Sequence, residues 1–132
     1  MKYLLDTNIC IYFLKGQFKL EKKFESVGLY EMAISEITVA ELVFGAENSQ
    51  NPSHNLETVE KFSEKITILP LIEAVKIYGK EKSRLRKEGK MISDFDLLIG
   101  ATAITNDLVM VTRNVKEFKR IKGIKLENWI DD

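Results

Sequence analysis

The chain has 132 residues, of which 45% are hydrophobic and 30% charged, and its twenty acidic side chains balance its twenty basic ones. This length suits one domain, which we expect to span residues 1–132, and the composition excludes a disordered or membrane-spanning chain. A net charge of zero argues against a general polyanion binder. Cys10 is the only cysteine, so no internal disulfide can form. Together with the lack of a recognisable secretory signal, this predicts a cytoplasmic protein without membrane contact.

Short apolar runs alternate along the chain with stretches of helical periodicity. In chain order we predict a strand at 2–5, helices at 8–14 and 18–26, a strand at 32–34, helices at 36–47 and 56–64, a strand at 66–69, helices at 71–88 and 95–105, a strand at 109–112, a helix at 115–120 and a last strand at 124–126. This alternation predicts an α/β fold with a central parallel sheet and helices on both faces. Functional sites of such sheets lie beyond the carboxyl ends of the strands, so acids that follow strands are candidates.

Two acids in the first third of the chain are difficult to explain by structure alone. Asp6 directly follows the first strand, where it could simply cap the next helix, but a strand end is also where a site would lie. Glu41 lies in an apolar stretch of the helix at 36–47, where a buried charge is costly unless it is paired or binds a metal. A salt bridge to a distant Lys or Arg is the structural alternative for Glu41.

Two further acids, Asp94 and Asp96, lie at the start of the apolar and therefore buried helix at 95–105. Both could serve as capping residues, since carboxylates suit the positive end of a helix dipole. Residues two apart in a helical turn point in different directions, so we expect only one of them to face the site. Asn114 and Glu117 follow the strand at 109–112 and could reach the same crevice.

Clustered carboxylates indicate a hard divalent cation, Mg²⁺ or Mn²⁺. One histidine and one cysteine cannot supply the ligands that zinc prefers. A hard cation activates water and neutralises charge on a phosphate, which suits phosphodiester hydrolysis. The glycine motifs of P-loop and dinucleotide-binding proteins are missing, and His54 lies in a stretch that we interpret as a polar surface loop.

Charged residues are segregated along the chain. Residues 21–64 contain nine Glu and three Lys, residues 76–90 contain seven basic and two acidic side chains, and residues 113–125 contain six basic and one acidic. A neutral protein with this distribution can present one basic face to a polyanion. Each basic run could equally be a solvated helix face.

Four segments in order along the chain, at 4–8, 35–46, 96–103 and 111–118, the last followed by Gly123 and Trp129, resemble the motifs of PIN-domain nucleases of the VapC toxin family. The resemblance implies a three-layer α/β/α sandwich and an endoribonuclease dependent on Mg²⁺ or Mn²⁺. It implies an RNA substrate, tRNA before rRNA and initiator tRNA first, whose cleavage inhibits translation. It also implies a homodimer, and a VapB-like antitoxin whose C-terminal segment covers the acidic site.

Asp6, Glu41 and Asp96 match the acidic positions of that family. We expect Asp6 and Asp96 to bind the metal, and Glu41 to bind it or to orient its water. The last acid of the family falls where this chain has Asn114, so the number of metals stays open, and Glu117 is a possible substitute. Further supporting candidates are Asp94, Thr7, Asn8 and Thr112. We expect the RNA backbone to contact the basic runs through Lys82, Arg86, Arg113 and Lys119.

Two alternatives belong to other functional classes. A Mg²⁺-binding phosphoacceptor signalling domain also has Asp at strand ends, but it typically needs adjacent acids after the first strand and a Lys after a late one. This chain has a lone Asp6 and, after the late strand, Arg113. A PIN-like RNA-binding module without catalysis is the other alternative, and a cleavage assay would distinguish it.

Overall fold

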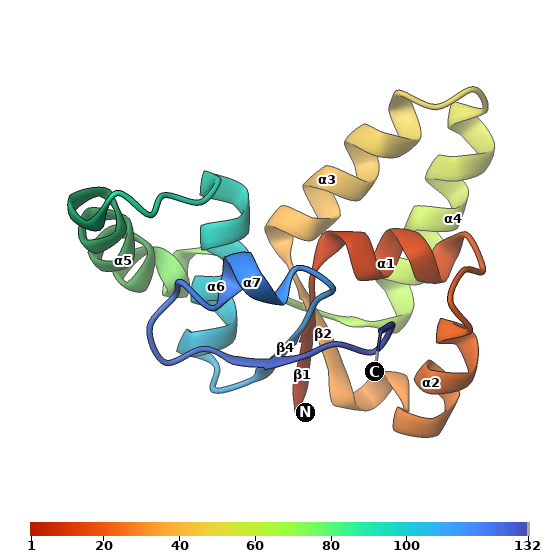
Figure 1. Cartoon of the computed structure of the whole chain (residues 1–132). Coiled ribbons are helices and arrows are strands. Elements are labelled where there is room, and N and C mark those ends of the chain that lie inside the picture. The colour runs from red at the N-terminus through yellow and green to blue at the C-terminus, as the bar shows by residue number, and fades with distance from the viewer. Residues whose placement is uncertain (132) are drawn as a thin grey trace.

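The computed structural model describes residues 1–131 and contains, in that range, a five-stranded sheet surrounded by helices (Figure 1). The strands are β1 (Tyr3–Leu5), β2 (Met32–Ser35), β3 (Thr67–Leu69), β4 (Val109–Val111) and β5 (Lys125–Glu127). The α-helices are α1 (Thr7–Leu14), α2 (Leu20–Val27), α3 (Glu36–Glu47), α4 (Pro52–Lys65), α5 (Val75–Glu88), α6 (Asp94–Thr105) and α7 (Val115–Phe118), and two 3-10 turns, η1 (Leu29–Glu31) and η2 (Ile72–Ala74), precede β2 and α5.

The sheet is parallel throughout, with strand order β3-β2-β1-β4-β5. β1 therefore lies in its centre, and the segments that follow β1, β2 and β4 emerge at the same edge. The predicted α/β fold with a central parallel sheet is confirmed, including the short last strand. Among the described residues, no helix is long and apolar enough to cross a membrane.

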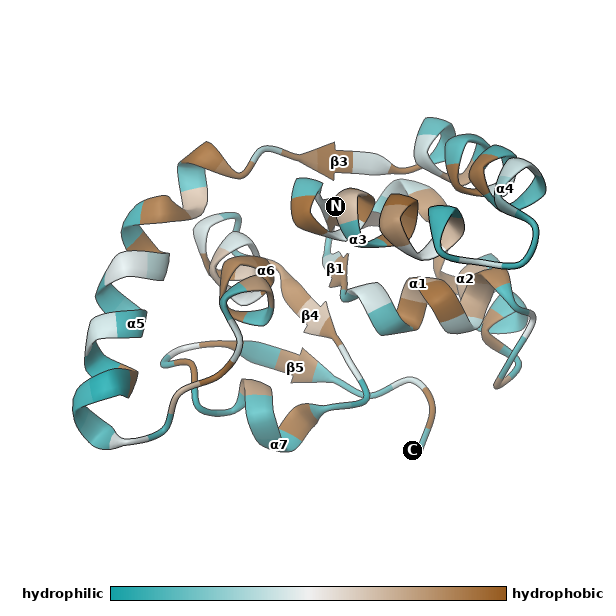
Figure 2. Cartoon of the chain, turned by 90° about the horizontal axis from the view of Figure 1, so that it is seen from above, coloured by the Kyte–Doolittle hydropathy of each residue, from teal (hydrophilic) through white to brown (hydrophobic). Residues whose placement is uncertain are grey.

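Alternate residues of the central strands serve two separate cores, as the period of two in a strand requires. Leu5 packs into a core with α1, α2, α3 and α4, whereas Leu4 packs into a second core with α5 and α6. Figure 2 shows these two helical groups on opposite sides of the strands. This is the three-layer sandwich expected from the resemblance.

The helix predicted at 18–26 begins only at Leu20, because Phe18 and Lys19 have positive φ, and the one predicted at 115–120 ends at Phe118. Two further helices differ more at their starts. The helix predicted at 56–64 begins at Pro52, because the side chain of Asn51 accepts a hydrogen bond from the His54 backbone N–H and Pro suits the first helical position. The interpretation of His54 as part of a loop is therefore wrong, although the residue is exposed. The helix predicted at 71–88 begins with the separate turn η2, and α5 starts only at Val75.

At Gly100, α6 packs closely against the side chain of Ile121 in the segment after α7. A Cβ atom on Gly100 would lie 2.4 Å from Cδ1 of the buried Ile121. Half of the residues of α6 are buried, fewer than predicted, and Phe95 in its first turn is 50% exposed. The close approach keeps α7 and the segment after it beside α6.

Candidate active site

Asp6 lies at the end of the central strand and is only 5% exposed. Its Oδ1 accepts a hydrogen bond of 2.9 Å from the Ile9 N–H, so Asp6 does cap α1. Its Oδ2 accepts a second bond, of 2.5 Å, from the hydroxyl of Thr112 just beyond β4. The helix cap therefore uses one carboxylate oxygen, and the other is oriented from the neighbouring strand.

The charge of Asp6 is disfavoured in this position. Burial raises the pKa of its carboxyl from 3.8 to about 6, against the opposing effect of its hydrogen bonds to Thr112 and Ile9. The negative charges of Asp96 and Glu41 raise this pKa further. The pKa of Asp6 is therefore influenced by two acids that are remote in sequence, Asp96 on α6 and Glu41 on α3.

Glu41 projects from α3 and is partly buried. Its Oε1 accepts a hydrogen bond of 2.6 Å from the Thr7 hydroxyl, which lies 3.0 Å from the hydroxyl of Thr38. Within residues 1–131, no salt bridge to Glu41 is formed, so the structural alternative of a Lys or Arg partner is not observed. Sequence analysis missed Thr38, although it lies one helical turn before Glu41 and hence on the same face.

Asp96 lies near the start of α6 and is partly buried. Its backbone N–H donates to Ser93 Oγ, which makes Ser93 the cap of this helix. Burial raises the pKa of the Asp96 carboxyl, and the charges of Glu117 and Glu41 raise it further, while the contact with Ser93 lowers it. Asp96 therefore belongs to the same electrostatic group as Asp6.

Asn114 and Glu117 reach this group from the turn after β4 and from α7. Asn114 Nδ2 donates a hydrogen bond of 2.8 Å to Glu117 Oε2, and the Asn114 backbone N–H donates to the Thr112 hydroxyl at 3.0 Å. Thr112 thereby connects the α7 segment to Asp6. The amide of Asn114 orients the only α7 acid beside Asp96.

Two sequence candidates lie apart from this group. Asp94 Oδ1 is 2.8 Å from Lys82 Nζ and accepts a hydrogen bond of 2.9 Å from the Tyr78 hydroxyl, so its side chain is directed to α5. These two contacts lower the pKa of Asp94. Asn8 is exposed, and its side chain makes no hydrogen bond within the described residues.

The four cations predicted to contact RNA differ in how they are engaged. Lys82 is paired with Asp94. Arg113 is paired with Asp131, and its guanidinium lies 4.8 Å from the centre of the Phe18 ring. Arg86 and Lys119 are exposed and form no salt bridge in the described part of the chain.

The donor set suits Mg²⁺ or Mn²⁺, since it consists of carboxylate, amide and hydroxyl oxygens. In residues 1–131, however, no three His, Cys, Asp or Glu side chains form a ready coordination shell. Mg²⁺ does not require one, because it usually keeps several waters and binds through one or two carboxylates. Asp6, Glu41 and Asp96 form no salt bridge in the described part of the chain, so their carboxylates fit a divalent ion.

The chain is similar to known proteins over nearly its full length. The model of the PIN domain family matches residues 3–124. The chain is 38% identical to ribonuclease VapC2 of Haemophilus influenzae, over 98% of this chain and 99% of that protein. It is 35% identical to the tRNA(fMet)-specific endonuclease VapC of Shigella flexneri, over 98% of each.

Solved structures agree with this likeness. The DNA-bound VapBC of Salmonella typhimurium matches with a TM-score of 0.92 and 36% identity, over 98% of each chain. VapBC2 of Rickettsia felis, bound to a DNA fragment from its promoter, matches with a TM-score of 0.88 and 34% identity, over 98% of this chain and 99% of that one.

Proposed function

This chain belongs to the PIN-domain family as a VapC-type ribonuclease, and from that premise we propose that it is a metal-dependent endoribonuclease acting as the toxin of a toxin–antitoxin pair. The observation that carries the metal dependence is the gathering of Asp6, Glu41 and Asp96 at the carboxyl edge of the sheet with no salt-bridge partner among residues 1–131. Burial and neighbouring negative charge raise the pKa of both Asp6 and Asp96. A divalent cation between them would remove this repulsion.

The residues of the site have distinct roles in this proposal. Asp6 and Asp96 would hold Mg²⁺ or Mn²⁺, and Glu41 would bind it or orient a water molecule. The ion supplies Lewis-acid activation of water and neutralises charge on the phosphate. Thr112 and Thr7 fix the carboxylates of Asp6 and Glu41 through their hydroxyls.

On the α7 side, Glu117 is the acid that stands in for a carboxylate at position 114. Its Oε2 is held by the Asn114 amide, and its charge acts on Asp96. Asn114 thus contributes by positioning Glu117. This arrangement is compatible with one ion held by Asp6 and Asp96 and leaves Glu117 to accept a hydrogen bond from a bound water.

The substrate that we propose is RNA in the cytoplasm, with tRNA ahead of rRNA and initiator tRNA as the first to be tested. The support is the 35% identity over the full chain with the Shigella flexneri protein, whose name specifies tRNA(fMet). Cleavage of initiator tRNA would inhibit translation.

The partner that we propose is a VapB-like antitoxin. Several of the similar structures are VapBC complexes. An apolar groove between α1, α3 and α4 includes Ile11, Leu42 and Val59 and also Glu41. An antitoxin segment in this groove would lie against Glu41 and would thereby block one side of the site. We further propose a homodimer, which would cover exposed apolar side chains such as Phe44 on α3, 69% exposed.

Incubation of the purified chain, free of antitoxin, with an initiator tRNA transcript tests the proposed activity. We expect cleavage with Mg²⁺ or Mn²⁺, none in excess chelator, and recovery when the ion is restored. Asp6→Asn should be inactive with either ion, and expressed alone it should not arrest growth, whereas the unchanged chain should. Undiminished cleavage in chelator would contradict the metal dependence, and equal toxicity of Asp6→Asn at equal protein level would contradict the role of Asp6.

A further inference from the structure

A strongly basic pocket is lined in part by the α7 segment, and Glu117 is not among its lining residues. It is lined by two arginines, four lysines and a single acid, Glu88, from the C-terminal part of α5, the loop after it, and the α7 segment. Figure 2 shows hydrophilic residues at this end of α5 and on α7. Neither basic run of the sequence forms this surface alone, because the fold brings the end of one beside the middle of the other.

The pocket is held in shape by an ion pair between the buried Glu81 and the partly buried Arg84. Glu81 on α5 is only 6% exposed and accepts two hydrogen bonds of 2.8 Å from the guanidinium of Arg84. It also accepts a bond of 2.6 Å from the Lys122 backbone N–H. Arg84 in turn donates to the Arg120 carbonyl oxygen at 2.7 Å. These bonds fix the chain at 120–122 against α5.

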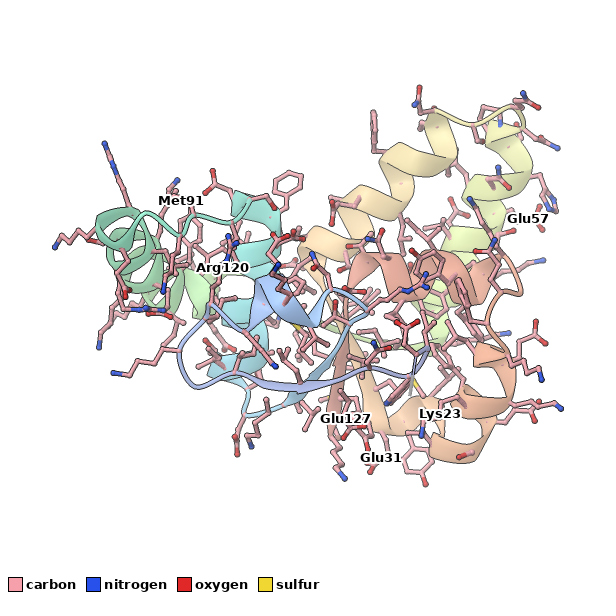
Figure 3. The ribbon with its side chains drawn as sticks, viewed as in Figure 1. Lys23, Glu31, Glu57, Met91, Arg120 and Glu127 are labelled. Atoms are coloured by element: carbon pink, nitrogen blue, oxygen red, sulfur yellow. The ribbon has the colours of Figure 1, made fainter. Side chains whose placement is uncertain are left out.

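A second contact fixes the loop between α5 and α6. The Arg120 guanidinium donates a hydrogen bond of 3.1 Å to the carbonyl oxygen of Met91, and Figure 3 shows these two residues together between α5 and α7. All three segments that line the pocket are therefore tied to one another. The backbone that carries its lysines is therefore fixed in place.

Four of these cations, Lys90, Lys116, Lys119 and Lys122, are exposed. Within the described residues they form no salt bridge, in contrast to Lys82 and Arg113. Like charges gathered in one pocket repel one another. A polyanion that binds there relieves the repulsion and releases its own counterions.

α7 connects this pocket to the acids. Glu117 on this helix faces Asp96, while the neighbouring Lys116 and Lys119 line the pocket. We propose that the basic pocket binds the phosphate backbone of the RNA substrate. The bound phosphates would lie next to the part of the RNA that passes over α7 to the acids. This inference rests on the proposed ribonuclease function, and it assigns the backbone contacts to the pocket rather than to the ion-paired Lys82 and Arg113.

The test is equilibrium binding of a fluorescein-labelled initiator tRNA transcript in chelator, over a series of salt concentrations. The pocket variant replaces Lys90, Lys119 and Lys122 by Ala. The control replaces Lys22, Lys61 and Lys65, which are exposed lysines of α2 and α4, and so has the same net charge. Three lost phosphate contacts should lower the slope of log affinity against log salt by about 2, and the affinity by more than about tenfold at low salt. Thermal melts should show both variants folded.

A pocket variant with the slope of the unchanged chain, or a control that loses as much, would overturn the proposal. Binding of polyglutamate, an acidic polypeptide, is measured in the same way. A pocket variant that loses affinity for polyglutamate but not for the tRNA would also overturn the proposal. Cleavage with Mn²⁺ is measured separately. A chain that binds RNA through the pocket but cleaves no RNA would contradict the nuclease function and would support the pocket.

Discussion

At the scale of single residues, the ionisation of the Asp6 carboxyl is favoured by its hydrogen bonds and disfavoured by its burial and its acidic neighbours. One oxygen caps α1, and the other accepts the hydroxyl of Thr112, and both contacts favour the ionised form. Burial and two neighbouring acids favour the neutral form more strongly, so the pKa rises to about 6. The free energy of unfolding must therefore depend on pH in a predictable direction.

The folded carboxyl of Asp6 titrates near 6 and the unfolded one near 3.8. Between these values the folded chain binds more protons, so its free energy of unfolding falls as pH rises, by at most about 3 kcal/mol from this group. Asp6→Asn keeps a capping oxygen and removes the titration. Urea unfolding of both forms in chelator should show the unchanged chain losing stability relative to Asp6→Asn from pH 4 to 6. Parallel pH profiles would contradict the assigned environment.

The neighbouring acids Asp94 and Asp96 provide a matched pair. Asp94→Asn loses an exposed contact with Lys82, so it should cost less than about 1 kcal/mol and leave cleavage nearly unchanged. Asp96→Asn removes a repelled carboxylate that we assign to the metal. Its cleavage rate should fall by more than about 100-fold, which is the largest loss expected when the replaced residue only holds a metal ligand in place. Its stability in chelator should not fall.

Single-turnover cleavage and thermal melts of the two variants check this pair. An inactive Asp94→Asn beside a normally active Asp96→Asn would mean that the third motif is aligned wrongly by two residues.

At the scale of secondary structure, the elements and the candidate acids could be predicted because both depend on local pattern. Asp6 ends an apolar run, and Glu41 interrupts the apolar residues of one helix, so both are visible without knowledge of the fold. The start of α4 was missed because Asn51 and Pro52, residues typical of turns, here begin a helix.

The contacts that could not be predicted connect distant parts of the chain. Thr7 and Thr38 are 31 residues apart, and Arg113 finds its partner Asp131 only when the C-terminus is in place. The sequence also gave no sign that Asp94 and Lys82 would pair across α5 and α6. Which cation stays available to a ligand is a property of the tertiary structure.

α5 offers a test of one such long-range contact. Glu81→Gln removes the negative charge that accepts hydrogen bonds from Arg84 and from the Lys122 N–H. Because hydrogen bonds to charged groups are worth about 2 kcal/mol, the variant should lose stability of that order. Glu88→Gln on the same helix removes an exposed pair with the same Arg84 and should cost less than about 1 kcal/mol. Urea unfolding at pH 7 measures both, and an equal cost would show that Glu81 does not fix the 120–122 segment.

At the scale of the whole molecule, the fold separates the charges that a neutral composition hides. The acidic run forms α3 and α4 with their surroundings, and the basic runs form α5 and the α7 segment. Figure 3 places Glu57 of α4 and Arg120 on opposite sides of the molecule. A polyanion should therefore approach the α5 and α7 side, with the acids at the carboxyl edge of the sheet between the two halves.

The central claim is that this fold assembles Asp6, Glu41 and Asp96 from three separate segments into one site for a divalent cation. Titration with Mn²⁺, with the free ion measured by electron paramagnetic resonance, tests it without reference to any RNA. We predict that Asp6→Asn and Asp96→Asn each bind Mn²⁺ at least about tenfold more weakly than the unchanged chain, while Asp94→Asn binds it equally well. Unchanged affinity in Asp6→Asn and Asp96→Asn, or an equal loss in Asp94→Asn, would contradict the account.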